Sequence, residues 1–385
     1  MASTGYSDTK LRELGAFHTA NEIVNQPGLW LKIYKQLVQD RNRITDFLND
    51  TLAKVDKIVL TGAGTSAYIG LSLQGTYFRN LKKHTCAIAT TDLISCPYDY
   101  LRDDESVLLI SFARSGNSPE SIAAVSLVEK ICKKSFHLII TCDPEGHLAK
   151  YKSDSLKCLV VLPPEANDKS LAMTGSYSGM LLTGLLIAWM NEIEKLEGQL
   201  EILHDYGNRI IDVYASKLKE IASYDFTRAV FLGSGPFFGT ATESQLKLQE
   251  LTDGNIVCKN DSYLGFRHGP KAVINEKTLV FFIFSNNAYV QQYEKDLVNS
   301  MKKGKKPMFT IGIFESPLNG LEFDLSIQLS DSGKQLEEGL LTVCDILPGQ
   351  LLGFYKSLAI GLKPDTPSES GAISRVVEGV KIYHY

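Results

Sequence analysis

The sequence lacks any apolar run long enough to cross a membrane. Its longest apolar segment, Met180 to Met190, has the length of a buried helix. The N-terminal residues show no basic segment followed by an apolar one, so we expect no signal peptide. The formal net charge of −4 provides no general excess of Lys and Arg for nucleic acid or an anionic membrane. These absences predict a cytoplasmic protein that binds neither nucleic acid nor a membrane.

Cysteine is scattered, and none of it forms a Cys-x-x-Cys pair. The number is odd, which argues against a disulfide framework and favours reduced thiols. No cluster of His, Cys and Asp has the spacing of a metal site, so we expect neither a metal nor a cofactor. The seven cysteines are Cys86, Cys96, Cys132, Cys142, Cys158, Cys258 and Cys344.

The chain repeats itself once. Lys57 to Thr61 and Arg228 to Leu232 are both apolar strands that end in Gly-x-Gly before a helical pattern. Further strands recur in the same order at an offset of roughly 170 residues, which indicates a duplicated domain. They are residues 107–112 with 279–284, and 136–141 with 308–313. Each half therefore predicts an α/β fold, a doubly wound, flavodoxin-like sandwich with helices on both faces of a parallel sheet.

This repeat divides the 385 residues into two domains of ordinary size. We expect an N-terminal leader over residues 1–52, with a helix from about Trp30 to Leu52. The first domain then covers residues 53–200 and the second covers residues 205–362. A charged linker lies between Asn191 and Tyr206, and residues 363–385 form a tail that folds over the site.

A polar loop in the first half predicts an anion site. The apolar run that begins at Val107 ends in Arg114-Ser-Gly-Asn-Ser118, and Pro119 and Glu120 then open a helical pattern. Free backbone N–H groups at a helix start attract anions, and hydroxyls gathered there favour a phosphate. The alternative is that Ser and Thr merely cap the helix, but capping accounts for one hydroxyl and not for a cluster.

Gly62-Ala-Gly-Thr-Ser-Ala67 also satisfies the dinucleotide fingerprint Gly-x-Gly-x-x-Gly/Ala. A nicotinamide dehydrogenase would need an acid at the end of the next strand, and Asp92 is the candidate. Against this reading, Thr65 and Ser66 stand where pyrophosphate binders prefer backbone alone. Two hydroxyl-bearing loops after neighbouring strands better suit one phosphomonoester.

These motifs resemble the phosphosugar-binding loops of sugar isomerase (SIS) domains, which occur in tandem in the isomerase half of glucosamine-6-phosphate synthase. The resemblance is closest to the AgaS group of tagatose-6-phosphate ketose/aldose isomerases and galactosamine-6-phosphate deaminases. Its segments are Leu60 to Ala67, Ile110 to Ser121, Gly265 to Lys271 and Asp365 to Ser368. It implies that sugar phosphate is bound by Gly64, Thr65, Ser66, Arg114, Ser115, Asn117 and Ser118. Arg114 stands where the synthase has a glutamine, and we expect it to add a charge-assisted hydrogen bond.

The second half replaces these hydroxyls with Pro236, Phe237 and Phe238, so we expect no phosphate there. Lys247 and Glu250 lie three residues apart on a helical pattern, where a surface ion pair is the ordinary interpretation. The resemblance instead makes Glu250 the catalytic acid/base, with Lys247 as its neighbour or a substrate contact.

Two further residues take roles from the resemblance. His268, in a loop rich in Gly and Pro, would open the cyclic sugar and reach the site of a neighbouring subunit, so we expect a homodimer with shared active sites. Arg375 falls where the synthase has a lysine. Because arginine keeps its proton, we expect it to orient substrate or stabilise an enediolate.

Together these features predict an enzyme of amino-sugar phosphate metabolism. It would convert galactosamine 6-phosphate to tagatose 6-phosphate, with hydrolytic loss of ammonia, through ring opening and proton transfer between C1 and C2. The alternatives are a plain tagatose-6-phosphate ketose/aldose isomerase and a non-catalytic sugar-phosphate sensor. No basic helix-turn-helix segment precedes Trp30, which argues against a DNA-binding sensor.

Overall fold

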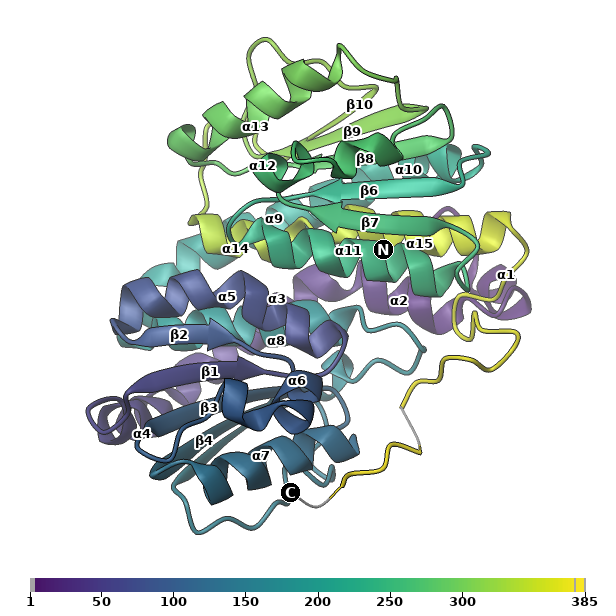
Figure 1. The fold of residues 1–385 in the computed structure, drawn as a ribbon. Coiled ribbons are helices and arrows are strands. Elements are labelled where there is room, and N and C mark those ends of the chain that lie inside the picture. Colours follow the sequence, from purple (N-terminus) through teal and green to yellow (C-terminus); the bar gives the residue numbers. More distant parts are fainter. Residues whose placement is uncertain (1–3, 377–378, 384–385) are drawn as a thin grey trace. The chain divides into compact units, whose positions relative to one another are not determined.

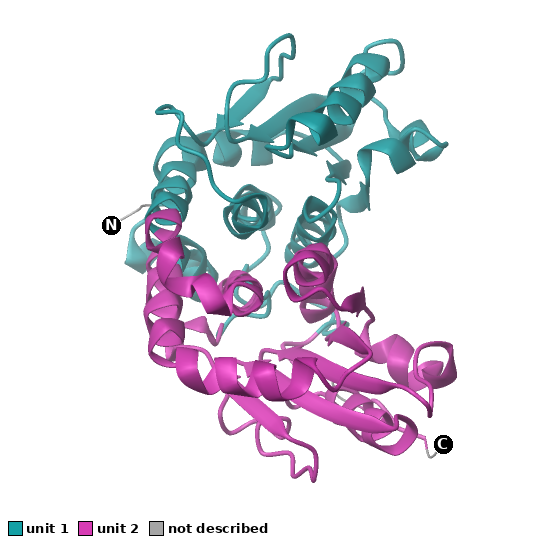
Figure 2. Ribbon diagram, turned by 90° about the vertical axis from the view of Figure 1, so that its left-hand side faces the viewer, with its two compact units in different colours: residues 1–27, 169–174, 201–373 teal, residues 28–168, 175–200, 374–385 magenta. Residues whose placement is uncertain are grey.

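The computed structural model describes residues 4–376 and 379–383. The chain divides into two compact units, which Figure 2 colours separately. Unit 1 contains Met1–Pro27, Lys169–Thr174 and Glu201–Ile373. Unit 2 contains Gly28–Asp168, Gly175–Leu200 and Ser374–Tyr385. Unit 2 therefore holds the first of the two repeated sheets, and unit 1 holds the second.

The sheet of unit 2 has five parallel strands in the order β2-β1-β3-β4-β5. This is the flavodoxin-like order, in which the chain reverses direction across the sheet between β1 and β3. The strands are β1 (Lys57–Thr61), β2 (His84–Ala87), β3 (Ser106–Ala113), β4 (Lys134–Thr141) and β5 (Lys157–Val161). The helices include α3 (Gln26–Gln39), α4 (Arg41–Leu52), α5 (Thr65–Leu81), α6 (Thr90–Ser95), α7 (Pro119–Ile131) and α8 (Gly175–Ala188), with 3-10 turns η1 (Pro97–Asp99), η2 (Pro164–Ala166) and η3 (Met190–Leu196).

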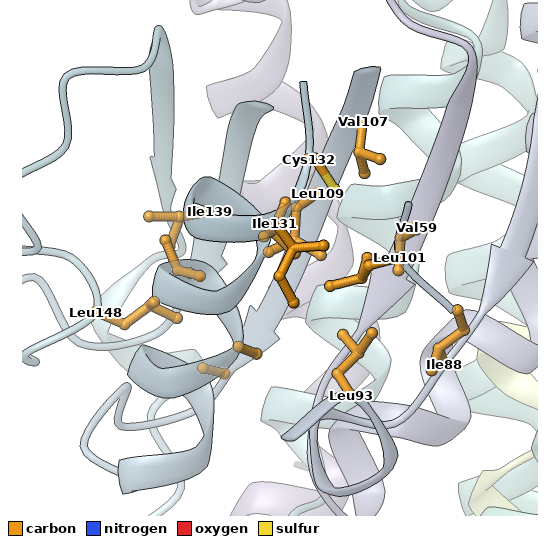
Figure 3. Close-up of a cluster of buried hydrophobic side chains, with 14 residues drawn as sticks. Val59, Ile88, Leu93, Leu101, Val107, Leu109, Ile131, Cys132, Ile139 and Leu148 are labelled. Carbon is orange, nitrogen blue, oxygen red and sulfur yellow. The ribbon is translucent and has the colours of Figure 1, made fainter. Parts of the chain in front are cut away.

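Helices cover both faces of this sheet (Figure 1). Helices α5 and α8 pack on one face, and α6 and α7 pack on the other. Every residue of β3 is buried, as expected for a central strand of a parallel sheet. Figure 3 shows the core on the α7 side, where Val59, Leu109 and Ile139 meet Ile131. Each such side chain stabilises the fold by about 1.5–3 kcal/mol on burial.

The apolar segment that ends near Met190 is the buried helix expected from the sequence. Every residue of α8 is buried. At Gly184 an added Cβ would collide with Leu73 of α5 and touch Phe112 of β3. Glycine therefore lets α8 approach α5 and β3 closely without displacing the buried Leu73 side chain. Among the described residues, no helix is both long and apolar enough to cross a bilayer.

The sequence predicts one leader helix from Trp30 to Leu52. The structure has two: α3 begins earlier, at Gln26, and α4 follows it after a break at Asp40. The Asp40 carboxylate accepts a hydrogen bond from Arg43 in the first turn of α4. Trp30 is fully buried, and its indole N–H donates to Ser178 of α8 at 3.0 Å. Helix α3 is thus part of the fold of unit 2.

The sheet of unit 1 repeats the same order, β7-β6-β8-β9-β10, again with parallel strands. Its strands are β6 (Arg228–Leu232), β7 (Val257–Asp261), β8 (Thr278–Ile283), β9 (Phe309–Phe314) and β10 (Leu325–Gln328). Its helices are α1 (Asp8–Glu13), α2 (Phe17–Val24), α10 (Ala215–Ala222), α11 (Phe237–Leu251), α12 (Tyr263–Phe266), α13 (Ala288–Met301), α14 (Glu338–Cys344) and α15 (Leu347–Ala359), with η5 (Pro270–Val273). The charged stretch expected as a linker is helical: α9 (Glu197–Arg209) follows η3 and precedes η4 (Ile210–Tyr214).

The predicted α/β fold is confirmed in both halves, and the repeated strands lie at equivalent positions of their sheets. One expectation is wrong: β2 ends at Ala87, and Asp92 lies in α6 instead of at a strand end. Strands β5, β7 and β10 were not predicted, because each lies at a sheet edge and is partly exposed. Such strands lack the continuous apolar run that marks a buried one.

Candidate active site

The loop after β1 has a backbone that only glycine allows. A Cβ at Gly62 would lie 2.6 Å from the backbone of Ser66, and Gly64 has a φ of +54°. This tight turn brings Thr65 and Ser66 into the first turn of α5. Both side chains are buried, and the Ser66 hydroxyl makes no hydrogen bond to another described residue. An unbonded hydroxyl therefore lies at the start of α5, the positive end of the helix dipole.

The loop after β3 lies beside it, because β1 and β3 are paired neighbours, with Thr61 opposite Ser111. Gly116 takes a φ of +63°, and Ser118 is the N-cap residue of α7. The Ser118 hydroxyl lies 2.7 Å from that of Ser121 and does not cap the helix. The first N–H groups of α7 thus have no side-chain cap. This edge, where the strand order reverses, is where open α/β sheets bind ligands.

The other members of this loop have internal partners. The Ser115 hydroxyl accepts from the backbone N–H of Asn117 at 3.3 Å. The Asn117 side chain accepts from the backbone N–H of His147 at 3.0 Å and so attaches the loop to the turn after β4. These bonds hold the hydroxyls of the loop in place.

Arg114 and Arg375 are brought together. The buried Arg114 guanidinium donates to the backbone carbonyl of Arg375. Arg375 donates through Nε and Nη2 to the carbonyl of Asp168, at 2.9 and 2.5 Å, and through Nη2 to the Asn167 side chain at 2.9 Å. These bonds fasten the tail of unit 2 beside the phosphate-type loop.

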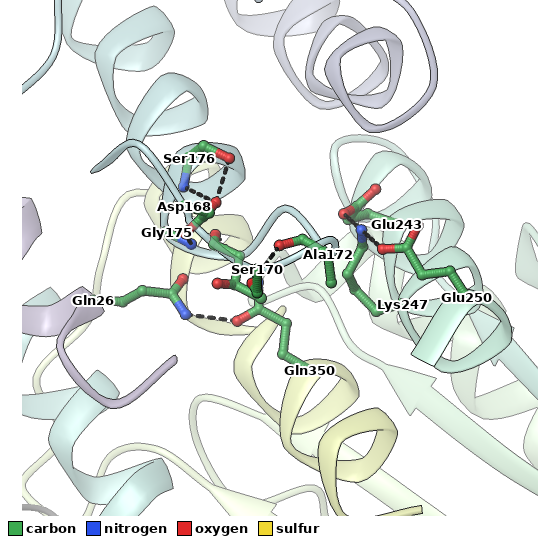
Figure 4. A network of polar contacts seen from close by, with 11 residues as sticks. Gln26, Asp168, Ser170, Ala172, Gly175, Ser176, Glu243, Lys247, Glu250 and Gln350 are labelled. Atoms are coloured by element: carbon green, nitrogen blue, oxygen red, sulfur yellow. Dashed lines mark hydrogen bonds and ion pairs between the residues drawn. The ribbon is translucent and has the colours of Figure 1, made fainter. Parts of the chain in front are cut away.

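Asp168 is a residue that the sequence reasoning missed. Its carboxylate is fully buried and accepts from the N–H groups of Gly175 and Ser176 at 3.0 and 2.9 Å, and from the Ser176 hydroxyl at 2.5 Å. Figure 4 shows this arrangement. An acid at the start of a helix stabilises its free N–H groups and its dipole. Its side chain therefore orders α8 while its carbonyl holds Arg375.

Helix α11 carries a row of charged residues. Lys247 and Glu243 have no exposed surface, and their charged atoms lie 3.1 Å apart (Figure 4). Lys247 also donates to Glu250, whose side chain is 15% exposed. Burial lowers the pKa of Lys247, but the two carboxylates outweigh it and raise the pKa above its ordinary value. The sequence predicted the Lys247–Glu250 pair and missed Glu243, although Glu243 stands one turn before Lys247.

His268 has no hydrogen bond or ion pair with these charged residues of α11. It is exposed in the turn after α12, where Gly269 has a φ of +115°. Its backbone N–H donates to Gly265, and its imidazole makes no hydrogen bond or ion pair with a described residue. Within unit 1 the structure therefore brings together Lys247 and Glu250 but does not join His268 to them.

The equivalent loops of unit 1 keep the backbone turn after the first strand but differ in their side chains. Gly235 has a φ of +56°, close to that of Gly64, but fully buried Phe237 stands where Ser66 does in unit 2. After β8, the N–H of Ser285 donates to Glu294 at 3.1 Å, and its hydroxyl donates to Glu338. Carboxylates of the protein itself therefore occupy the donors of this loop.

One of these carboxylates has a strongly altered pKa. Burial raises the pKa of Glu294 to about 8, and the neighbouring Glu338 carboxylate adds to the rise, while the hydrogen bond from Ser285 opposes it. Glu294 is therefore mostly protonated at neutral pH. No group of three His, Cys, Asp or Glu with a metal-binding arrangement occurs in residues 4–376 and 379–383.

Comparison with known proteins agrees with this geometry. The SIS domain model matches residues 51–190. A galactosamine-6-phosphate deaminase, AgaS, from Shewanella sp. (strain ANA-3) is 39% identical over 384 residues, which cover 98% of this chain and 95% of the relative. The crystal structure of tagatose-6-phosphate ketose/aldose isomerase from Escherichia coli has a TM-score of 0.87 and 32% identity, over 100% of this chain and 99% of that one. A solved structure from Clostridium novyi NT has a TM-score of 0.95 and 40% identity, over 99% of both chains.

Two parallel sheets of this order, the first with phosphosugar-type loops, define a tandem SIS-domain protein. Within that class, the chain belongs to the AgaS family. The resemblance expected from the motifs is thereby confirmed. The dinucleotide interpretation is wrong, because the acid that it requires lies in α6.

Proposed function

We propose that this protein is a galactosamine-6-phosphate deaminase that releases tagatose 6-phosphate and ammonia. The observation that carries the proposal is the charged row Glu243, Lys247 and Glu250 on α11. Burying three charges on one helix is costly, and a protein that only binds sugar phosphate has no use for them. Relatives that match nearly the full chain are named as a galactosamine-6-phosphate deaminase and a tagatose-6-phosphate ketose/aldose isomerase, and these names support a sugar phosphate as the substrate.

In the proposed mechanism the phosphate lies on the loops after β1 and β3. Gly64, Thr65 and Ser66 line the first loop, and Ser115 and Ser118 line the second. The starts of α5 and α7 are the positive ends of their helix dipoles and complement a dianion. Fixing the phosphate holds the sugar in register for chemistry at its other end. The second loop is attached to the turn after β4 by Asn117, and the Arg114–Arg375 hydrogen bond holds the tail beside it.

Proton transfer is assigned to Glu250. His268 opens the ring, and the Glu250 carboxylate then removes the proton from C2 of the open aldose as the C1 oxygen gains a proton. The enolamine is protonated at C1 by the Glu250 carboxylic acid and becomes a ketimine at C2. Water adds to this carbon and the C–N bond breaks, which gives the ketose and ammonia. Glu250 fits this role because it retains exposed surface, whereas Glu243 is fully buried and holds Lys247.

The assembly and location are part of the same proposal. We infer a cytoplasmic homodimer with shared active sites, in which His268 serves the site of the second copy. The exposed imidazole, without a partner among the described residues, supports this arrangement. Mixing a His268→Ala variant with a Glu250→Gln variant should restore up to about a quarter of the activity if sites are shared by random exchange of subunits. Without shared sites, the mixture would stay inactive.

The direct test is an assay of ammonia and ketose formation from galactosamine 6-phosphate, with glucosamine 6-phosphate as the epimer control and galactosamine as the control without phosphate. We expect equal amounts of ammonia and tagatose 6-phosphate. Interconversion of tagatose 6-phosphate and galactose 6-phosphate without ammonia release would favour the plain isomerase. Binding without any turnover would favour a sensor.

A further inference from the structure

We propose that unit 1 contains a second anion site, a pocket that binds a phosphorylated small molecule with at least two negative charges. The pocket has a volume of about 460 Å³, within the range of small-molecule sites. It lies between the turn that follows α12 and the end of α13. It is separate from the loops after β1 and β3, which belong to unit 2.

The charge of the lining is the first argument. Arg267 and Lys271 come from the turn after α12, and Lys303 and Lys305 come from the loop after α13. No acidic residue is among the lining residues. None of the four cationic side chains makes an ion pair or hydrogen bond with another described residue.

This concentration of positive charge is not explained by composition. The whole chain has 40 Lys and Arg against 44 Asp and Glu. Cations just after a helix complement its dipole, which accounts for lysines beyond Met301. It does not account for Arg267 and Lys271, which reach the same pocket from a different segment. Like charges gathered in one place repel each other, and an anion bound between them removes that repulsion.

The remaining lining supports a ligand larger than phosphate. Ala272, Ile274 and Met301 give the pocket apolar surface beside the cations. Helices α12 and α13 share one core, in which Phe266 and Leu297 are fully buried, so both walls rest on a rigid base. A small molecule with an apolar part and a charged phosphate end matches this combination. The pocket also adjoins the His268 turn, because Arg267 and Gly269 both line it.

The test measures binding and not turnover, so it is independent of the proposed function. Pyrophosphate and ADP are titrated into the full-length protein by calorimetry at low salt. The variant K303Q/K305Q removes two lining charges. K302Q/K306Q is the matched control, because it removes two charges from the same exposed loop at positions that do not line the pocket.

We expect at least one probe to bind, with affinity reduced about 10-fold or more in K303Q/K305Q and less than about 3-fold in the control. Lys271→Gln, on the other wall, should weaken the same probe. Slower hydrogen exchange over residues 267–274 in the presence of the probe would locate the ligand. Equal losses in the two double variants would show a general effect of surface charge and overturn the proposal. Binding that is unchanged in K303Q/K305Q, or no binding by any probe, would also overturn it.

Discussion

Lys247 and Glu243 lie one helical turn apart on α11 with their charged atoms 3.1 Å apart and no exposed surface on either side chain. Buried charges of this kind are stable only as a set, because each is costly to leave without a counter-charge. Glu250 completes the set and alone retains some exposure. The arrangement gives Glu243 a positioning role toward the pair that the mechanism uses.

Replacing Glu243 should therefore be costly. Glu243→Gln keeps the shape and removes one of the two carboxylates that hold the pKa of Lys247 above its ordinary value. We expect the free energy of unfolding to fall by about 2–4 kcal/mol in urea denaturation. Glu13→Gln is the control, since the Lys10–Glu13 pair is exposed and its loss should cost less than about 1 kcal/mol. Similar losses in the two variants would contradict the role of burial.

Glu250→Gln separates chemistry from binding. The amide cannot accept and return a proton, so we expect kcat to fall by about 100-fold or more while KM stays within a few-fold. Glu276→Gln, which changes an exposed carboxylate of the same unit, should retain full activity. A Glu250→Gln enzyme with unchanged kcat would remove this residue from the mechanism.

The hydroxyls at the helix starts should determine affinity for the phosphate. Ser66→Ala and Ser118→Ala each remove one donor, and we expect KM for galactosamine 6-phosphate to rise by about 10-fold. Ser95→Ala is the control, because this exposed hydroxyl bonds only within its own turn of α6. If KM in Ser66→Ala and Ser118→Ala stays at the wild-type value, as expected for the Ser95→Ala control, the phosphate lies elsewhere.

The tail of unit 2 should depend on Arg375. Arg375→Ala removes the hydrogen bonds to Asn167 and Asp168, so we expect trypsin to cleave after Lys381 about 10-fold faster. Ser374→Ala, whose hydroxyl bonds only within the tail, should leave the cleavage rate near that of the wild type. Arg375→Lys should be intermediate, because an ammonium cannot reproduce the planar array of donors. Equal cleavage rates would show that other contacts hold the tail.

Glu294 predicts a dependence of stability on pH. Its pKa of about 8 in the folded state is above that of an exposed glutamate, so its contribution is complete at low pH and is lost as the pH rises through about 8. At pH 5 the free energy of unfolding of Glu294→Gln should be equal to, or slightly below, that of the wild type. At pH 9 it should be about 1–4 kcal/mol above that of the wild type. The measurement is urea denaturation from pH 5 to pH 9, with Glu276→Gln as the exposed control. A constant difference across this range would contradict the assignment.

The sequence alone determined the duplicated α/β architecture and the loop that resembles a phosphosugar site. Both depend on local patterns: buried strands of β1, β3, β6 and β8 are continuous apolar runs, and the turns need glycine at fixed places. The same patterns misled where local signals are weak, as at Asp92 and at the break between α3 and α4. Edge strands such as β5 were missed for the same reason.

Only the tertiary structure decided which charged residues matter together. Lys247 and Glu250 resemble a surface ion pair in sequence, and burial by the surrounding core makes them a desolvated cluster with Glu243. The pocket at Arg267 and Lys303 joins segments that no sequence spacing relates. Burial and electrostatic environment arise from contacts between distant segments, so they appear only when the chain is folded.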